Sequence, residues 1–224
     1  MRRPRFIAEQ ARHARGALGR VLAFIMARET WAQNQRAIAA LDLSERDHVI
    51  DIGCGHGRSL AALAAAASHG SVAGVDPSDL MAEIAVRRNC SLVKAGRVDV
   101  RVASAADLPY ANDTFDKALC VHVIYFWSDL RTSFREIARV MKPGGRFVLV
   151  FRTDADEAAV KAFPADIYSF RSTGAVMEAL TEAGFAVEAP AEPTRTPVLL
   201  VATKRPARAR ARAALDAEDA NHAH

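Results

Sequence analysis

Short apolar runs alternate with amphipathic segments along most of the chain, a pattern typical of strands that alternate with helices. The predicted strands cover residues 48–52, 71–75, 98–102, 117–121 and 146–151. The predicted helices cover residues 58–68, a segment that begins after Ser78, and the stripe of Leu130, Phe134, Ile137 and Met141. Because strands that alternate with helices form parallel sheets covered on both faces, the pattern predicts an α/β fold.

The two ends of the chain have different patterns. Residues 1–41 have helical character with a break near Gly16 and Gly19, and their apolar stripe consists of Leu18, Leu22, Ile25 and Met26. Near the other end, a predicted helix ends at Gly184, and two strands are predicted after it, at 185–189 and 197–203. We therefore expect an N-terminal helical lid over residues 1–41 and a main domain over residues 42–204. Residues 205–224 have no periodic apolar face and are expected to be disordered.

The first predicted strand leads into a glycine-rich turn. Asp51 ends the strand, and glycines follow at alternate positions, 53, 55 and 57. Glycine lets a backbone approach a ligand without a Cβ in the way, although an ordinary tight strand-to-helix turn also fits the loop taken alone. The dinucleotide fingerprint would need a glycine at position 58, where this chain has Arg58. The second strand ends in Asp76, whose carboxylate can accept hydrogen bonds from both hydroxyls of an adenosine ribose.

This loop resembles the first motif of the class I S-adenosylmethionine-dependent methyltransferases, in particular the type 11-like members that act on small molecules. The further matching segments are residues 108–116, 139–146 and 182–185, in family order, and the resemblance covers roughly residues 40–203. It implies a Rossmann-like, mostly parallel sheet of seven strands with helices on both faces. It also implies that the final strand inserts antiparallel between its neighbours.

The resemblance implies S-adenosylmethionine as the cofactor, with Asp51 near its ammonium group and Asp76 on its ribose. Met81 would pack on the adenine, although it also fits a plain core position. Ser104 stands where many family members have an aspartate, and its neutral hydroxyl is a weaker acceptor for the adenine amino group. The residues expected at the cofactor are Asp51, Gly53, Cys54, Gly55, Gly57, Asp76, Pro77, Met81, Ser104, Ala105 and Cys120.

The sequence marks the residues that would contact the methyl acceptor less specifically than those expected at the cofactor. His122 follows the fourth strand and is the candidate general base, because an imidazole titrates close to neutral pH, and His56 is a weaker second candidate. Aromatic residues near positions 125 and 168 could line an acceptor pocket under the lid or could form a hydrophobic seam there. The candidate acceptor residues are Trp31, Asn34, Tyr125, Trp127, Tyr168 and Phe170.

Charge and cysteine usage limit the classes of partner. The net charge is +4, but residues 1–28 carry +6 and residues 204–212 carry +5, so the body between them is mildly acidic. A phosphate-tracking groove is not supported, and no nucleic-acid partner is expected. Three cysteines without paired spacing favour a reducing, cytoplasmic compartment, and no metal-ligand spacing is present. The longest apolar run near the N-terminus, residues 21–27, is too short for a signal core or a membrane span.

The leading interpretation is methyl transfer to oxygen, nitrogen, sulfur or carbon of a small, part-apolar acceptor. One alternative is a phospholipid headgroup N-methyltransferase whose basic residues 1–28 contact anionic lipid. Another is a non-catalytic protein that binds S-adenosylmethionine or a partner protein. The sequence does not indicate an oligomeric state.

Overall fold

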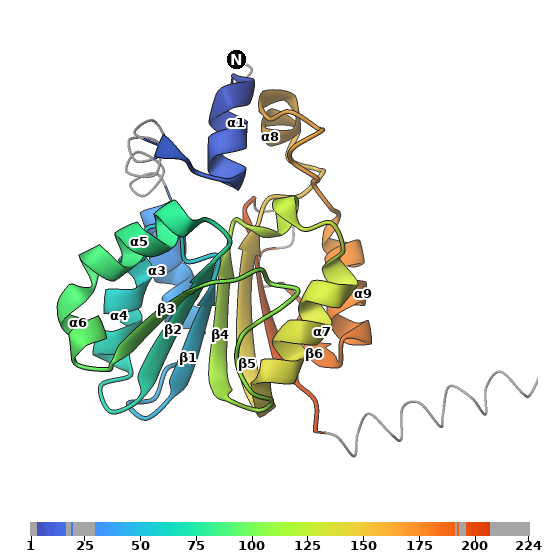
Figure 1. Cartoon of the computed structure of the whole chain (residues 1–224). Coiled ribbons are helices and arrows are strands. Elements are labelled where there is room, and N and C mark those ends of the chain that lie inside the picture. Colours follow the sequence, from blue (N-terminus) through green and yellow to red (C-terminus); the bar gives the residue numbers. More distant parts are fainter. Residues whose placement is uncertain (1–3, 17–18, 20–29, 191, 193–195, 207–224) are drawn as a thin grey trace, which may run out of the picture.

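A seven-stranded sheet forms the centre of the computed structural model, which describes residues 4–16, 19, 30–190, 192 and 196–206 (Figure 1). The strand order among these residues is β3-β2-β1-β4-β5-β7-β6. The strands are β1 (His48–Ile52), β2 (Ser71–Asp76), β3 (Val98–Val102), β4 (Phe115–Val121), β5 (Met141–Phe151), β6 (Phe185–Val187) and β7 (Val198–Lys204).

The strand directions are those that the family resemblance implies. Strands β1 to β5 pair in parallel, with Asp51 of β1 opposite Gly74 of β2 and Leu119 of β4. Strand β7 lies between β5 and β6 and is antiparallel to both. The carboxyl ends of β1, β2 and β4 therefore meet at one edge of the sheet, where open α/β folds form their ligand crevice.

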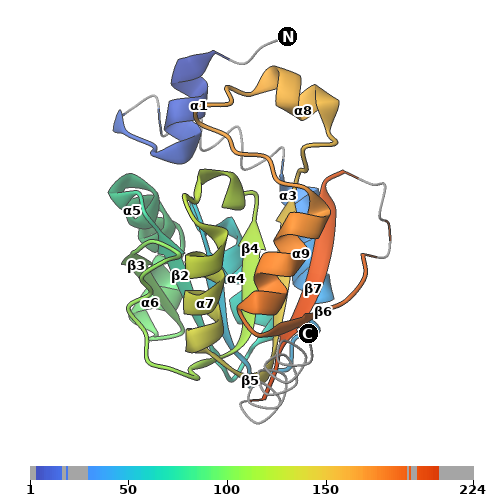
Figure 2. The same ribbon diagram turned by 90° about the vertical axis from the view of Figure 1, so that its right-hand side faces the viewer.

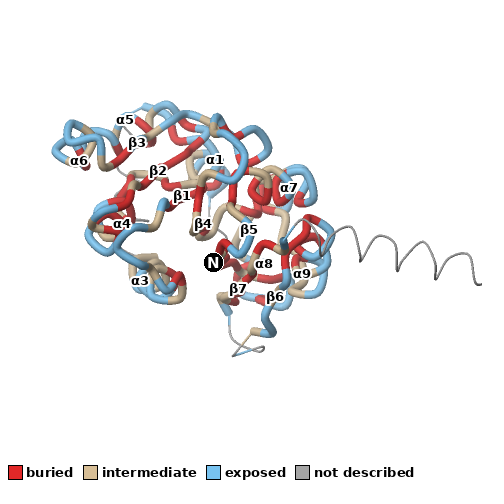
Figure 3. The backbone as a smooth tube through the Cα atoms, turned by 90° about the horizontal axis from the view of Figure 1, so that it is seen from below, coloured by how far each residue is buried: buried red, intermediate tan, exposed pale blue. Residues whose placement is uncertain are grey.

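Helices cover both faces of the sheet. One face carries α3 (Trp31–Ala40), α4 (Arg58–Ala66), α5 (Asp79–Arg88) and α6 (Cys90–Lys94), and the other carries α7 (Leu130–Val140) and α9 (Thr173–Glu182). Side chains of β1 alternate between these layers: Ile50 and Ile52 pack with α7 and α9, whereas Val49 packs with α3 and α4. Seen from below, buried segments follow the strands, and the short α6 at the edge is largely exposed (Figure 3).

Two helices lie above the carboxyl edge of the sheet. Helix α1 (Arg5–Arg12) and helix α8 (Glu157–Ala162) are side by side in two perpendicular views (Figures 1 and 2). The guanidinium of Arg5 lies 2.6 Å from the carboxylate of Asp166, which ties α1 to the segment after α8. None of the described helices has the length and apolarity that crossing a membrane requires.

Most predicted element boundaries agree with the structure to within two residues. Ser78 is the N-cap of α5 and accepts a hydrogen bond from the Met81 N–H, and Gly184 follows the end of α9 with a φ of +97°. Strand β5 begins at Met141 instead of residue 146, and α6 and α8 were not predicted. The apolar stripe from Leu18 to Met26 and most of the predicted tail, residues 207–224, lie outside the described residues.

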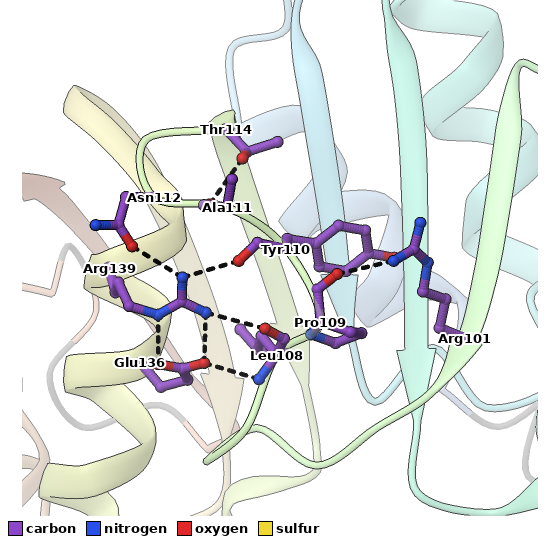
Figure 4. Close-up of polar contacts among 9 residues, drawn as sticks. All are labelled: Arg101, Leu108, Pro109, Tyr110, Ala111, Asn112, Thr114, Glu136 and Arg139. Atoms are coloured by element: carbon purple, nitrogen blue, oxygen red, sulfur yellow. Dashed lines mark hydrogen bonds and ion pairs between the residues drawn. The ribbon is translucent and has the colours of Figure 1, made fainter.

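The segment between β3 and β4, which carries part of the family resemblance, is held by an arginine and a glutamate of α7. The guanidinium of Arg139 pairs with Glu136 at 2.7 Å and donates to the carbonyl oxygens of Leu108 and Tyr110 (Figure 4). Glu136 accepts in turn from the Leu108 N–H at 2.8 Å. This motif therefore fixes the loop against α7, and its role in the fold is structural.

Candidate functional site

A cavity of about 490 Å³ opens at the carboxyl edge of the sheet. Its walls come from the glycine loop between β1 and α4, the loops after β2, β3 and β4, the start of α3, and segments beside α1 and α8. The volume lies in the range of small-molecule sites, which is about 300–1,000 Å³.

The glycine loop is packed against protein at two of its glycines and open at the third. Gly53, Gly55 and Gly57 all have positive φ, +74°, +54° and +71°. A Cβ at Gly53 would collide with Val123, and one at Gly57 would collide with Ala85, whereas one at Gly55 would meet no atom within 4 Å. The backbone at Gly55 therefore faces free space in the cavity.

Two buried carboxyl groups lie beside this loop. Asp51, at the end of β1, is 3% exposed and accepts a hydrogen bond from the Ser59 hydroxyl. Burial raises its pKa to about 7, and the nearby charge of Asp76 adds to the shift. Asp76, at the end of β2, accepts the Gly55 N–H at 3.0 Å and the Ser78 N–H at 2.9 Å. Burial raises the pKa of Asp76 as well, and these hydrogen bonds oppose the rise.

The N-terminal segment closes the cavity at the Asp76 end. The Ser78 hydroxyl donates to the Ala14 carbonyl at 3.0 Å, and residues 10–14 line this part of the wall. Met81 of α5 and buried Ala105, after β3, line the same part.

Aromatic rings surround the opposite part of the cavity. Tyr125 and Phe126 come from the 3₁₀ turn η1 (Ile124–Phe126), and Phe163, Tyr168 and Phe170 come from the chain after α8. The ring centroids of Phe163 and Tyr168 lie 4.5 Å apart, those of Phe126 and Tyr168 lie 4.8 Å apart, and those of Tyr125 and Phe170 lie 5.1 Å apart. We call these five residues the aromatic compartment.

A short chain of hydrogen bonds links His122 to Tyr125 of the aromatic compartment and to Gln33 of α3. His122 follows β4 with a φ of +60°, a conformation that is uncommon for a residue with a side chain. Its Nδ1 lies 3.0 Å from the Tyr125 hydroxyl, and its Nε2 lies 2.6 Å from Oε1 of Gln33 on α3. The Tyr125 hydroxyl also accepts the backbone N–H of Arg152 at 2.6 Å. Burial and the charge of Arg152 lower the pKa of His122 to about 4, so the ring is neutral at pH 7.

Comparison with known proteins agrees with this arrangement. Residues 50–149 match a family model described as a methyltransferase domain. An O-methyltransferase of Aspergillus sclerotiorum is 38% identical over 112 residues, which are 50% of this chain and 42% of that protein. An O-methyltransferase of Pyrenophora dematioidea is 32% identical over 151 residues, 64% of this chain and 56% of that protein. Residues 50–149 therefore form a methyltransferase domain.

The architecture of this methyltransferase domain is also found in solved structures. Geranyl diphosphate C-methyltransferase from Streptomyces coelicolor, solved with Mg²⁺, geranyl diphosphate and S-adenosyl-L-homocysteine, superposes with a TM-score of 0.67 at 18% identity. The match covers 85% of this chain and 86% of that one. At this identity the likeness shows the fold alone. The chain spans about half the length of the curated relatives that it matches.

The methyltransferase domain brings most of the sequence-predicted site residues to one cavity. Every residue expected at the cofactor lines it except Gly57 and Cys120. Gly57 is the N-cap of α4, and Cys120 is fully buried within β4. All six candidate acceptor residues and His122 line the cavity, although the Trp127 ring also packs on Phe134 of α7, with the centroids 5.5 Å apart.

Three polar residues of this site were missed by sequence reasoning. Gln33 and Arg152 take part in the hydrogen bonds around His122, and the Arg58 guanidinium lies 4.0 Å from the centre of the Trp31 ring. Arg152 directly follows β5, so the rule that ligands bind at the carboxyl ends of strands could have pointed to it. The sequence of α3 does not identify the partner of Gln33, because His122 lies 89 residues further along the chain.

Proposed function

We propose that this protein transfers a methyl group from S-adenosylmethionine to a hydroxyl group of a small, part-apolar acceptor. The observation that carries the proposal is a single cavity that joins the glycine loop and two buried carboxyl groups to the aromatic compartment and His122. The O-methyltransferases among the relatives favour oxygen over the other acceptor atoms.

The residues present suit the cofactor. The open face at Gly55 leaves room for a ligand against the backbone, and Asp76 has two carboxylate oxygens with lone pairs to spare for ribose hydroxyls. Asp51 offers a buried carboxyl group to an ammonium. Met81 and Ala105 provide an apolar wall for a flat adenine ring.

When bound, S-adenosylmethionine supplies a methyl group that its positively charged sulfur already activates. The protein therefore contributes mainly by holding the acceptor in line and excluding water, an effect worth about 7–11 kcal/mol in well-oriented reactions. The aromatic compartment would bind the apolar part of the acceptor, and α1 and α8 would cover it. His122 would receive the hydroxyl proton, since its ring is neutral at pH 7.

Calorimetric titration tests the cofactor half of the proposal. S-adenosylmethionine and S-adenosylhomocysteine should bind and NAD should not. Asp76→Ala should weaken binding by about tenfold to a hundredfold, because charge-assisted hydrogen bonds contribute about 1.5–3 kcal/mol. Asp79→Ala is the matched control, since Asp79 is a nearby carboxylate that is exposed at the start of α5. Equal affinity in the two variants would remove Asp76 from the cofactor site.

A methyl-transfer assay with labelled cofactor tests the acceptor half. A panel of phenols, hydroxylated quinols and aliphatic alcohols should contain at least one substrate that is lost in Tyr168→Ala. Tight cofactor binding without turnover on any hydroxyl, amine or thiol would instead favour the non-catalytic interpretation.

A second candidate function, headgroup methylation at a membrane surface, draws on two exposed apolar side chains. Phe6 of α1 is 50% exposed and Val160 of α8 is 43% exposed, and these helices lie side by side over the cavity (Figure 2). If this candidate is correct, the full chain co-sediments with anionic liposomes and Phe6→Ser reduces that binding. Val86→Ser, an exposed apolar residue of α5, should leave it unchanged.

A further inference from the structure

We propose that Gln33 is a positioning residue that determines which ring nitrogen of His122 carries the proton. The acceptor must displace the Gln33 carboxamide before His122 can receive a proton. This inference rests on the proposed function, because it concerns the group that would receive the acceptor's proton.

The hydrogen bonds around His122 assign the protons. Oε1 of Gln33 is only an acceptor, so its 2.6 Å contact with Nε2 requires a proton on Nε2. In a neutral ring Nδ1 then has a lone pair, and the Tyr125 hydroxyl donates to it at 3.0 Å. The Tyr125 hydroxyl can donate to Nδ1 because the Arg152 N–H donates to the Tyr125 oxygen, at 2.6 Å, and does not involve the hydroxyl proton. Both nitrogens of His122 are therefore engaged, and neither offers a lone pair to an acceptor.

The position of Gln33 on its helix supports a specific role. Residues 33, 37 and 41 recur at four-residue spacing, and Ala37 and Leu41 are fully buried against the sheet. Gln33 continues this inward stripe at the end that reaches the cavity. A polar residue at an otherwise apolar stripe position needs a polar partner, and His122 is that partner.

Displacement of Gln33 changes what His122 can do. The Tyr125 oxygen has two lone pairs, so it can accept from the Arg152 N–H and from a proton on Nδ1 together. The other tautomer then becomes available, with Nδ1 protonated and the Nε2 lone pair facing the cavity. In methyl transfer the acceptor oxygen would gain the methyl group as the bond from that carbon to the cofactor's sulfur breaks and S-adenosylhomocysteine leaves, and the acceptor's O–H bond would break. The released proton goes to Nε2, and His122 later loses it to solvent.

The surroundings of His122 favour this neutral ring in both arrangements. Arg152, after β5, is the charged group that acts on it, and its cation opposes protonation. Tyr125 in η1 and Gln33 in α3 contribute hydrogen bonds but no charge at pH 7. A carboxylate in place of the Gln33 amide would be the only anion in contact with the ring among the described residues.

Nitrogen-15 NMR of the histidine side chains in the full chain tests the proposal without any acceptor. His122→Asn identifies the His122 signals. The wild type should show the tautomer with a proton on Nε2 that exchanges slowly with solvent. Gln33→Ala should make that proton exchange at least about tenfold faster, since it loses its acceptor. Gln35→Ala, an exposed glutamine of the same helix, should have no effect.

Gln33→Glu distinguishes positioning from a general structural role. Its carboxylate should keep the proton on Nε2 and raise the midpoint of the His122 titration by about one to three pH units. A wild-type ring protonated on Nδ1, or a midpoint that Gln33→Glu leaves in place, would overturn the proposal. Equal exchange rates of the Nε2 proton in Gln33→Ala and Gln35→Ala would also overturn the proposal. If the NMR results agree but no hydroxyl acceptor turns over, the proposed function fails while the assignment of Gln33 to His122 stands.

Discussion

At the scale of single residues, the two buried carboxyl groups of the cavity form no ion pair with any described residue. Among the described residues, neither Asp51 nor Asp76 has a basic side chain within 4.0 Å. Hydrogen bonds from Ser59, Gly55 and Ser78 only partly replace the water that these carboxyl groups lose on burial. A cationic ligand would supply the missing partner, which is why this end of the cavity suits an ammonium group.

The raised pKa of Asp51 predicts a pH-dependent affinity. An ammonium group binds the ionised form of the Asp51 carboxyl group. Because the pKa of Asp51 is about 7, this carboxyl group is largely protonated at pH 6 in the free protein. Affinity for S-adenosylmethionine should therefore rise by about tenfold between pH 6 and pH 8, since one pH unit corresponds to about 1.4 kcal/mol. Titration calorimetry at both pH values measures this, and Asp51→Asn should bind weakly with little pH dependence. A wild-type affinity that does not change would contradict the assignment.

The same group affects stability with the opposite trend. Its folded pKa is raised above the unfolded value of 3.8, so the folded protein holds a proton that the unfolded chain releases. The contribution of Asp51 to the free energy of unfolding is full below pH 3.8 and is lost as pH rises through about 7. In chemical denaturation without ligand, the wild type should therefore lose stability relative to Asp51→Asn between pH 5 and pH 8. A constant difference between the two proteins would contradict this.

At the scale of elements, the turn from β1 into α4 contains two glycines that pack against protein and one that faces the cavity. Gly55→Val should lose cofactor binding, because its side chain would enter the space that the cofactor needs. Gly96→Val is a matched control, since Gly96 also has positive φ, +68°, and open space around it. Both substitutions should cost about 1–2 kcal/mol of stability from backbone strain. Calorimetric titration of the two variants measures cofactor binding, and thermal melts measure their stability. Cofactor binding by a folded Gly55→Val protein would exclude the glycine loop from the cofactor site.

The loop between β3 and β4 depends on the Arg139–Glu136 pair of α7. Arg139→Ala should destabilise the fold by about 2–4 kcal/mol, because the loop carbonyls and Glu136 lose a charged donor. Arg135→Ala, exposed on the same helix, should change stability by no more than about 0.5 kcal/mol. Urea denaturation of both variants checks this difference, and similar midpoints would show that the network contributes little.

Elements with local signals were predictable, and those that depend on distant contacts were not. The strands that end in Asp51 and Asp76 and the cap at Ser78 follow from apolar runs and turn chemistry. The start of β5 was misplaced because Met141 continues the helical stripe of α7 in sequence but pairs with Phe115 in the sheet. The aromatic compartment could be suspected from its residues. Its connection to α3 through Gln33 could not, since 89 residues separate Gln33 from His122.

At the scale of the whole molecule, the N-terminal segment covers more than the acceptor side. The sequence predicts a lid over residues 1–41, and residues 10–14 also line the cavity wall beside Asp76. Their hydrogen bond to Ser78 links this segment to the loop that holds Asp76. The core of the sheet contains little of α1, because Ala8 is its one fully buried residue there and Ala11 packs against the core only partly buried. Truncation of the N-terminal segment can therefore remove this part of the cavity wall and leave the sheet folded.

Removing residues 1–28 should leave the sheet folded but weaken cofactor binding. The truncated protein loses the wall at residues 10–14, so its affinity for S-adenosylhomocysteine should fall by about tenfold, the equivalent of roughly one lost hydrogen bond with some packing. Turnover on any acceptor should fall further, because α1 also excludes water from the aromatic compartment. Removal of residues 207–224 is the control, since every cavity-lining residue among those described precedes them. Circular dichroism verifies the fold and calorimetry measures the affinity. An unchanged affinity would limit the N-terminal segment to the acceptor side, and a loss of folding would make it part of the core.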